Sequence, residues 1–92
     1  MEQRWTLWTI TDKTPPHGPL TTDNFEEYIL EVKEGNGINL ILVTGGRPVP
    51  YPNLRSGDTR RSEIGLLLRG LSYTVSRTPG HPGQFKVVVS VR

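Results

Sequence analysis

The expected fold depends on residues 38–71, which begin Ile38-Asn39-Leu40-Ile41-Leu42-Val43-Thr44 and continue through Gly45-Gly46-Arg47-Pro48-Val49-Pro50-Tyr51-Pro52 to a leucine-rich segment. Apolar side chains occupy both faces of the first seven residues. This pattern is typical of a strand in the interior of a sheet that is covered on both sides, and such sheets are commonly parallel. We therefore predict a buried central strand over residues 38–44.

A long loop, Gly45 to Thr59, is predicted to follow this strand. Loops of about 15 residues are uncommon in compact domains and are usually functional or disordered. The three prolines at alternate positions fix φ and favour an extended run over full disorder. A loop between the carboxyl end of a strand and a helix is also where open α/β sheets bind ligands. We expect either a binding loop or a stiff surface connection.

A first amphipathic helix is predicted over residues 23–34. Phe25, Ile29 and Val32, together with Tyr28, recur at three-to-four-residue spacing and would form one apolar stripe. The glutamates of the segment lie mostly off this stripe and would face water. The Gly-Asn-Gly sequence that follows tolerates positive φ and is expected to end the helix.

A second helix is predicted over residues 60–71. Its first turn would contain Arg60 and Arg61, against the usual preference for acidic residues at the positive end of the helix dipole. A bound anion would relieve this conflict, and so would solvation. The apolar positions that would face the core are Ile64, Leu67, Leu68 and Leu71.

The remaining segments predict strands. Residues 4–11 are rich in β-branched and aromatic side chains, and residues 72–77 and 84–92 flank a turn-rich link, as in a hairpin. The expected order is therefore β-α-β-α-β-β. We predict an α+β fold, an α/β two-layer sandwich, in which a four-stranded mixed sheet with a C-terminal hairpin packs against two helices. One domain would span residues 1–92.

Composition limits the environment of the protein. The chain of 92 residues contains no cysteine, which fits a reducing compartment. No apolar run reaches the roughly 18 to 20 residues of a membrane span, and the N-terminus has no signal-peptide pattern. We expect a soluble, cytoplasmic protein that does not contact a membrane.

Charge is distributed unevenly along the chain. The net charge is −4 over residues 1–46 and +6 over residues 47–92, and seven of the eight basic residues in the second half are arginine. Arginine suits bidentate contact with phosphate or carboxylate better than lysine does. An acidic surface beside a basic one, both facing solvent, would give the same distribution.

The arginines near the long loop are the strongest candidates for a binding site. They belong to one loop and to the helix start that follows it, so we expect them to crowd one rim of the sheet. Clustered arginines near an aromatic ring suit a nucleic-acid backbone with base stacking, and they also suit an acidic protein surface. The candidate residues are Arg47, Tyr51, Arg55, Arg60 and Arg61.

Catalytic and metal-binding motifs are not found in the sequence. His17 and His81 both lie in Pro/Gly-rich segments without carboxylates at ligand spacing, whereas a metal site needs three or four ligands. Gly45-Gly46 lacks the spacing of a dinucleotide fingerprint and the lysine of a P-loop, so it is read as a turn. We expect no cofactor and no metal, and a function that does not involve catalysis.

Three landmarks of the sequence are His17-Gly18 ahead of Glu26, Val43-Thr44-Gly45-Gly46, and the glycine-rich turn 80–83. They resemble landmarks of the Smr (small MutS-related) domain. The predicted order of elements also resembles that of the Smr domain, of the C-terminal domain of bacterial translation initiation factor three and of the Alba proteins, all of which bind nucleic acid. Thr14-Pro15-Pro16 replace the aspartate and leucine expected before the His-Gly signature of Smr domains, and Arg47 replaces a glycine. The resemblance implies nucleic-acid binding, and it would place His17 in the site of an Smr-like nuclease.

Three functions follow from the sequence. The first is a small non-enzymatic module that binds DNA or RNA through the arginine set. The second is a compact inhibitor or adaptor of the kind encoded by viruses and phages, which would dock on a protein by the proline loop or the acidic helix. The third is the Smr-like nuclease. Self-association as a homodimer, through an open edge near Val88 and Val91, is a further expectation.

Overall fold

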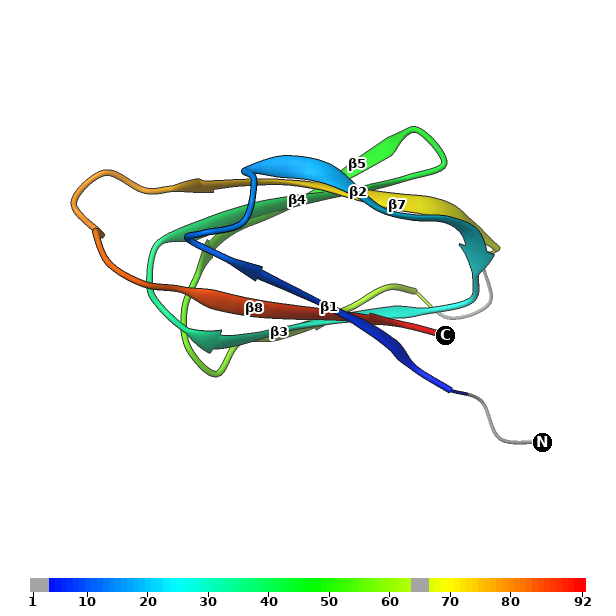
Figure 1. Cartoon of the computed structure of the whole chain (residues 1–92), viewed down its shortest axis with the longest axis horizontal. Coiled ribbons are helices and arrows are strands. Elements are labelled where there is room, and N and C mark those ends of the chain that lie inside the picture. Colours follow the sequence, from blue (N-terminus) through cyan, green and yellow to red (C-terminus); the bar gives the residue numbers. More distant parts are fainter. Residues whose placement is uncertain (1–3, 64–66) are drawn as a thin grey trace.

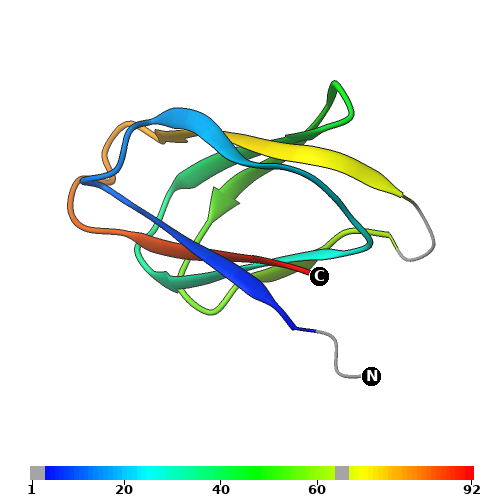
Figure 2. The same ribbon diagram turned by 45° about the vertical axis from the view of Figure 1, so that its right-hand side comes forward.

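The computed structural model describes residues 4–63 and 67–92, and these form two antiparallel four-stranded sheets (Figures 1 and 2). One sheet has the strand order β1-β8-β3-β6 and the other the order β2-β7-β4-β5. The two sheets face each other as the layers of a sandwich. The strands are β1 (Thr6–Thr11), β2 (His17–Phe25), β3 (Tyr28–Glu34), β4 (Ile38–Thr44), β5 (Arg47–Leu54), β6 (Thr59–Arg61), β7 (Leu68–Arg77) and β8 (Lys86–Val91).

The strand pairs are nested along the chain. β1 pairs with β8, β2 with β7, β3 with β6 and β4 with β5, and all four pairs are antiparallel. This is the pattern of a long antiparallel ribbon that has been wrapped into two layers. Two further pairs, β3 with β8 and β4 with β7, complete the sheets. The arrangement is that of a jelly-roll sandwich.

Alternate residues of the strands fill the space between the sheets. In β4 the side chains of Leu40 and Leu42 are fully buried, whereas Ile41 between them is 36% exposed. A strand places successive side chains on opposite faces, so one face of each sheet is core and the other faces solvent. The most deeply buried side chains are Ile10, Leu30, Val32, Ile38, Leu40, Leu42, Leu54, Val87 and Val89.

The first predicted helix is wrong. Residues 23–34 contain the end of β2, a short turn and all of β3. Tyr28, Leu30 and Val32 alternate in the buried face of β3, so the segment also satisfies a two-residue period. The helical spacing of its other apolar residues is coincidental, because pairing with β8 decides the conformation.

The second predicted helix is wrong as well. Residues 59–61 form the short edge strand β6, and β7 begins at Leu68. Ile64 lies outside the described residues. Of the three described apolar positions, Leu67 is 63% exposed, Leu68 is half-buried and Leu71 is fully in the core. Within residues 4–63 and 67–92, no helix is long and apolar enough to cross a membrane.

The predicted C-terminal hairpin does not form, although both of its segments are strands. β7 pairs with β2 and β4, whereas β8 pairs with β1 and β3 in the other sheet. The link of residues 78–85 therefore crosses between the layers. The α+β class, the mixed sheet and the β-α-β-α-β-β order are all overturned by this two-sheet topology.

Residues 38–44 form a strand as predicted, but only one face of this strand is in the core, whereas burial of both faces was expected. The loop predicted after it is a second strand. Gly45 and Gly46 have φ values of 58° and 76°, as the two central residues of a type I′ turn require, and they join β4 to β5 as a tight hairpin. The alternate prolines of β5 lie at the edge of its sheet. An edge strand tolerates proline where the backbone nitrogen faces away from the neighbouring strand, because no N–H donor is needed there.

We predict that Leu40→Ala lowers the free energy of unfolding by about 2 to 5 kcal/mol, because it leaves a cavity between the sheets. Ile41→Ala, one residue away on the solvent face, is the matched control and should cost less than about 1 kcal/mol. Urea unfolding of both variants measures the difference. Equal losses would contradict the assignment of the two faces of β4.

Candidate functional site

The inner face of β5 turns polar toward one end of the sandwich. The register with β4 sets Tyr51 opposite Leu40, Val49 opposite Leu42 and Arg47 opposite Thr44. Side chains that are opposite one another in an antiparallel pair lie on the same face of the sheet. Arg47, Val49 and Tyr51 therefore share the inner face, and the alternation leaves the prolines on the outer one.

A hollow of about 750 Å³ lies beside this end of β5, and we call it the β5–β6 hollow. Both strands are sheet edges, one in each layer, and they are consecutive in the chain. The hollow therefore opens where the two layers are not joined by strand pairing. Its lining residues are Tyr28, Thr44, Gly45, Arg47, Val49, Tyr51, Arg61, Ser62, Glu63, Leu67, Leu68 and Arg69.

Two tyrosines from opposite sheets meet in the wall of the hollow. The hydroxyl oxygens of Tyr28 and Tyr51 are 2.5 Å apart, and the rings pack edge to face. Burial raises the pKa of Tyr28 above its ordinary value, and the hydrogen bond to Tyr51 raises this pKa further. The Tyr28 hydroxyl is thus neutral near pH 7. Either hydroxyl group could be the donor of the hydrogen bond between the two tyrosines.

Arg47 and Arg69 supply positive charge to the hollow. The Arg69 backbone is fixed at the β4–β5 turn, because its N–H donates to Thr44 Oγ1 at 3.1 Å and its carbonyl accepts from Gly45 N at 2.9 Å. Both arginine side chains are exposed. Within the described part of the chain, neither guanidinium group makes a hydrogen bond or an ion pair.

Arg61 is engaged in an ion-pair cluster with Glu27, which is only 3% exposed. Glu27 Oε1 accepts from Arg61 Nη2 at 2.6 Å, and its Oε2 accepts from Arg92 Nη2 at 2.7 Å. These hydrogen bonds lower the pKa of Glu27, and the one from Arg92 has the larger effect. The Arg92 guanidinium carbon also lies 5.1 Å from the ring centroid of Trp5. The cluster therefore connects β6 with the residues that flank β1, β3 and β8.

The structure brings some of the predicted site residues together and separates others. Arg47, Tyr51 and Arg61 line the β5–β6 hollow, as a shared binding surface would require. Arg55 lies in the turn between β5 and β6, and Arg60 Nη1 donates to the carbonyl of Thr59. Neither lines the hollow. Arg60 and Arg61 also have no helix dipole to oppose, because they lie in a strand.

Sequence reasoning missed Arg69, Tyr28 and Ser62. Arg69 is far from the loop in sequence and reaches the hollow only because β7 pairs with β4. Ser62 Oγ accepts from Tyr28 N at 2.9 Å, a contact across 34 positions of the chain. No local signal marks these residues, since each depends on strand pairing.

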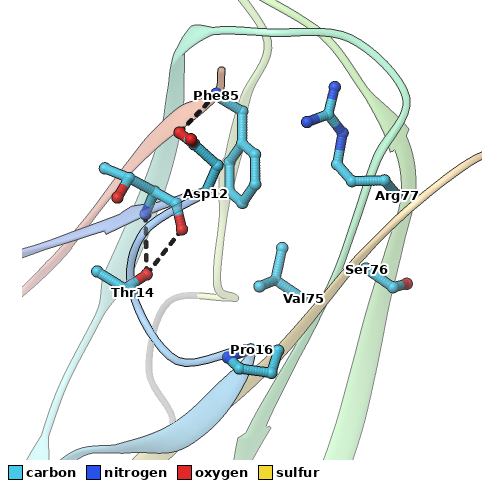
Figure 3. Close-up of a pocket in the computed structure, with 8 residues that line it drawn as sticks. Asp12, Thr14, Pro16, Val75, Ser76, Arg77 and Phe85 are labelled. Atoms are coloured by element: carbon cyan, nitrogen blue, oxygen red, sulfur yellow. Dashed lines mark hydrogen bonds between the residues drawn. The ribbon is translucent and has the colours of Figure 1, made fainter. Parts of the chain in front are cut away.

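A second hollow of about 320 Å³ lies between the β1–β2 turn and the end of β7 (Figure 3). Asp12 accepts a long hydrogen bond from Phe85 N, and the Arg77 guanidinium carbon lies 5.0 Å from the Phe85 ring centroid. Arg77 donates to the carbonyls of Gly83 and Asn36, whereas its buried Nε finds no partner in the described residues. These contacts tie loops together, so we assign Arg77 a structural role.

The histidines do not build a site. His17 is exposed in the edge strand β2, and His81 packs over Gly37, where an added Cβ would meet its ring at 2.7 Å. Among residues 4–63 and 67–92, no group of three His, Asp or Glu side chains could hold a metal ion.

The strand order defines a class, the jelly-roll sandwich, and this fold carries many unrelated functions. The sequence matches no protein-family model, and no curated protein is significantly similar to it. The Smr resemblance was based on the predicted order β-α-β-α-β-β, and the chain does not have this order. Function must therefore be argued from the site.

We predict that Glu27→Gln reduces the dependence of stability on acidic pH. The arginines hold the pKa of Glu27 below its ordinary value of 4.5, so its ion pairs stabilise the folded state above that pH. This stabilisation is lost as pH falls through the lowered pKa, because the unfolded chain binds a proton first. Urea unfolding between roughly pH 3 and pH 6 measures the effect.

Glu26→Gln is the matched control, since Glu26 is the exposed neighbour of Glu27. The wild type and Glu26→Gln should lose stability more steeply on acidification than Glu27→Gln does. The same slope in all three proteins would contradict the role of the ion-pair cluster.

Proposed function

We propose that this chain binds single-stranded nucleic acid, DNA or RNA, at the β5–β6 hollow. The observation that carries the proposal is that two exposed arginines, Arg47 and Arg69, line one hollow together with the half-buried Tyr51. Neither guanidinium group has a partner among residues 4–63 and 67–92. Each guanidinium group has paired donors that match the oxygens of a phosphate. A ring beside such groups suits stacking of an unpaired base.

The size and charge of the hollow support a nucleotide. Its volume of about 750 Å³ is within the range of small-ligand sites, roughly 300 to 1,000 Å³. The described lining has three arginines and one carboxylate, Glu63. Glu27 already pairs with Arg61, which leaves Arg47 and Arg69 as the principal phosphate ligands. A single strand suits the site because its bases are free to leave the stack.

A protein partner is the alternative outcome. Arginine also binds carboxylates, and the exposed Leu67 at the rim would suit an acidic peptide with an apolar residue. Docking through an acidic helix is no longer proposed, because residues 23–34 form no helix and Glu27 is buried. A non-enzymatic role and a cytoplasmic location stay predictions.

We predict that Arg47→Ala and Arg69→Ala each weaken binding of a short single-stranded oligonucleotide by about tenfold, as expected for loss of a charge-assisted hydrogen bond. Each should also lower the salt slope of the affinity by about 0.7. Fluorescence anisotropy from roughly 50 to 200 mM salt measures both quantities. Arg60→Ala, an exposed arginine outside the hollow, is the matched control and should bind as the wild type does.

Absence of binding at low salt, or an equal loss for Arg60→Ala, would contradict the proposed site. Tighter binding of a duplex than of a single strand would contradict the class of ligand. Binding of an acidic peptide that requires Arg47 and Arg69, with no binding of oligonucleotides, would replace nucleic acid by protein as the partner.

We predict that Tyr51→Phe and Tyr51→Ala will distinguish the contribution of the ring to binding from that of its hydroxyl group. If the ring stacks on a base, Tyr51→Phe should keep most of the affinity, whereas Tyr51→Ala should lose about 1 to 3 kcal/mol of binding free energy. The same anisotropy titration measures both variants, after circular dichroism has shown that each is folded. Equal loss in the two variants would mean that the hydroxyl group, and not the ring, contacts the ligand.

A further inference from the structure

Charge in the β5–β6 hollow is divided between its two walls. Arg47 in β5 and Arg69 in β7 belong to one sheet. Glu63 follows β6 of the other sheet and is the one carboxylate among the described residues that line the hollow. Arg61, which lies on the same wall as Glu63, already pairs with Glu27. A ligand in the hollow therefore meets positive charge from one layer and negative charge from the other.

The position of Glu63 is set by its neighbour in the chain. Ser62 N donates to the carbonyl of Tyr28 at 3.0 Å, and Ser62 Oγ accepts from Tyr28 N at 2.9 Å. These hydrogen bonds hold the backbone just ahead of Glu63 against the first residue of β3. Glu63 is exposed, and its carboxylate makes no hydrogen bond or ion pair with residues 4–63 and 67–92. Its oxygens are therefore available to accept hydrogen bonds from a ligand.

An unpaired carboxylate in a phosphate-binding hollow repels phosphate unless the ligand also brings hydrogen-bond donors to it. In the proposed function, Arg47 and Arg69 bind the phosphate and the ring of Tyr51 stacks on the base. The base is then the part of the nucleotide that can offer N–H groups to the opposite wall. Unpaired bases are commonly recognised in this way, by hydrogen bonds to their Watson–Crick edges.

The bases differ in what their Watson–Crick edges present to a carboxylate. Guanine presents two adjacent donors, N1–H and the N2 amino group, which match the two carboxylate oxygens. Adenine and cytosine each present one amino group beside a ring nitrogen that is an acceptor. Thymine and uracil present a single N–H between two carbonyl oxygens. A carboxylate only accepts, so guanine alone can bind it with two donors and no opposed acceptor.

We infer, on the basis of the proposed function, that the β5–β6 hollow selects guanine and that Glu63 is the residue that recognises it. The two Glu63 oxygens accept from N1–H and from the N2 amino group of the base that stacks on Tyr51. Two parallel hydrogen bonds to a carboxylate are strong and geometrically specific. The site therefore has a base preference in addition to its affinity for phosphate.

Guanine has a second edge that a protein can read, where O6 and N7 accept a bidentate pair from arginine. Arg47 and Arg69 have the donors for that contact. The two modes of recognition use different atoms of the base. Recognition by a carboxylate needs the N2 amino group and does not involve N7, whereas recognition by an arginine needs N7 and does not involve the amino group. Base analogues that lack one of these groups therefore distinguish the two modes.

Short DNA strands that carry a single base test the selection of guanine. Every strand has the same number of phosphates, and only its central nucleotide carries a base, so only one base can enter the hollow. Competition with one labelled oligonucleotide, followed by fluorescence anisotropy, measures each affinity. The wild type should bind the guanine strand about tenfold more tightly than the adenine, cytosine or thymine strand, which is within the range that a bidentate pair contributes.

Two analogues of guanine identify the edge that is recognised. Hypoxanthine keeps N1–H but lacks the N2 amino group, so it should lose most of the preference over adenine. 7-Deazaguanine keeps both donors and lacks N7, so it should bind as guanine does. The opposite result, with weak binding of 7-deazaguanine and full binding of hypoxanthine, would assign the preference to an arginine and overturn the role of Glu63.

Glu63→Gln should remove most of the preference for guanine, because an amide has only one acceptor oxygen and its NH₂ group opposes the second guanine donor. The ratio of the affinities for the guanine and adenine strands is the readout, so the general effect of removing a negative charge from the hollow cancels. Glu34→Gln, the same change at an exposed position outside the hollow, is the matched control and should keep the wild-type ratio. Circular dichroism shows whether each variant is folded.

Failure of guanine selection and failure of the proposed function give different results. Equal affinity of the wild type for all four bases, or an unchanged ratio in Glu63→Gln, would overturn the selection of guanine and leave phosphate binding at Arg47 and Arg69 in place. An equal loss of the ratio in Glu34→Gln would overturn the assignment to Glu63. Absence of binding to every strand, including oligonucleotides with a base at each position, would overturn the proposed function and the selection of guanine with it.

Discussion

The structure depends on one constraint: alternate side chains of both sheets must be buried in the space between the two sheets. Leu30 and Val32 of β3, opposite Val87 and Val89 of β8, fill the interior from one side, and the inner residues of β4 and β7 fill it from the other. Any slip of one residue would turn these side chains to solvent. The register of the four central strands therefore fixes the position of every edge strand and of the site.

The candidate site exists because the sandwich is not closed at its β5 and β6 edges. Strand pairing satisfies the backbone within each sheet, and between the edges only side chains can connect the layers. The Tyr28–Tyr51 hydroxyl pair makes this connection, and the cluster of Glu27 with two arginines fixes β6 to its sheet. Because these contacts occupy Arg61, the arginines left for a ligand are Arg47 and Arg69.

The edges also give the proline run a meaning that differs from the one expected. The run was interpreted as a stiff loop, but it forms an edge strand. Its backbone N–H donors face the neighbouring strand β4, and its prolines face the open edge of the sheet.

The sequence by itself determined that 38–44 is a central strand, that 45–46 is a turn, and that arginines and Tyr51 gather near the proline run. It did not determine that 23–34 is a strand, because Phe25, Ile29 and Val32 fit a helical period while Tyr28, Leu30 and Val32 fit a strand period. Only the tertiary structure decided between them, since the choice depends on whether β8 is available to pair with the segment. For the same reason Arg69 lies in the site and Arg60 does not. Strand pairing brings together residues that are distant in sequence, and local sequence patterns do not indicate which strands pair.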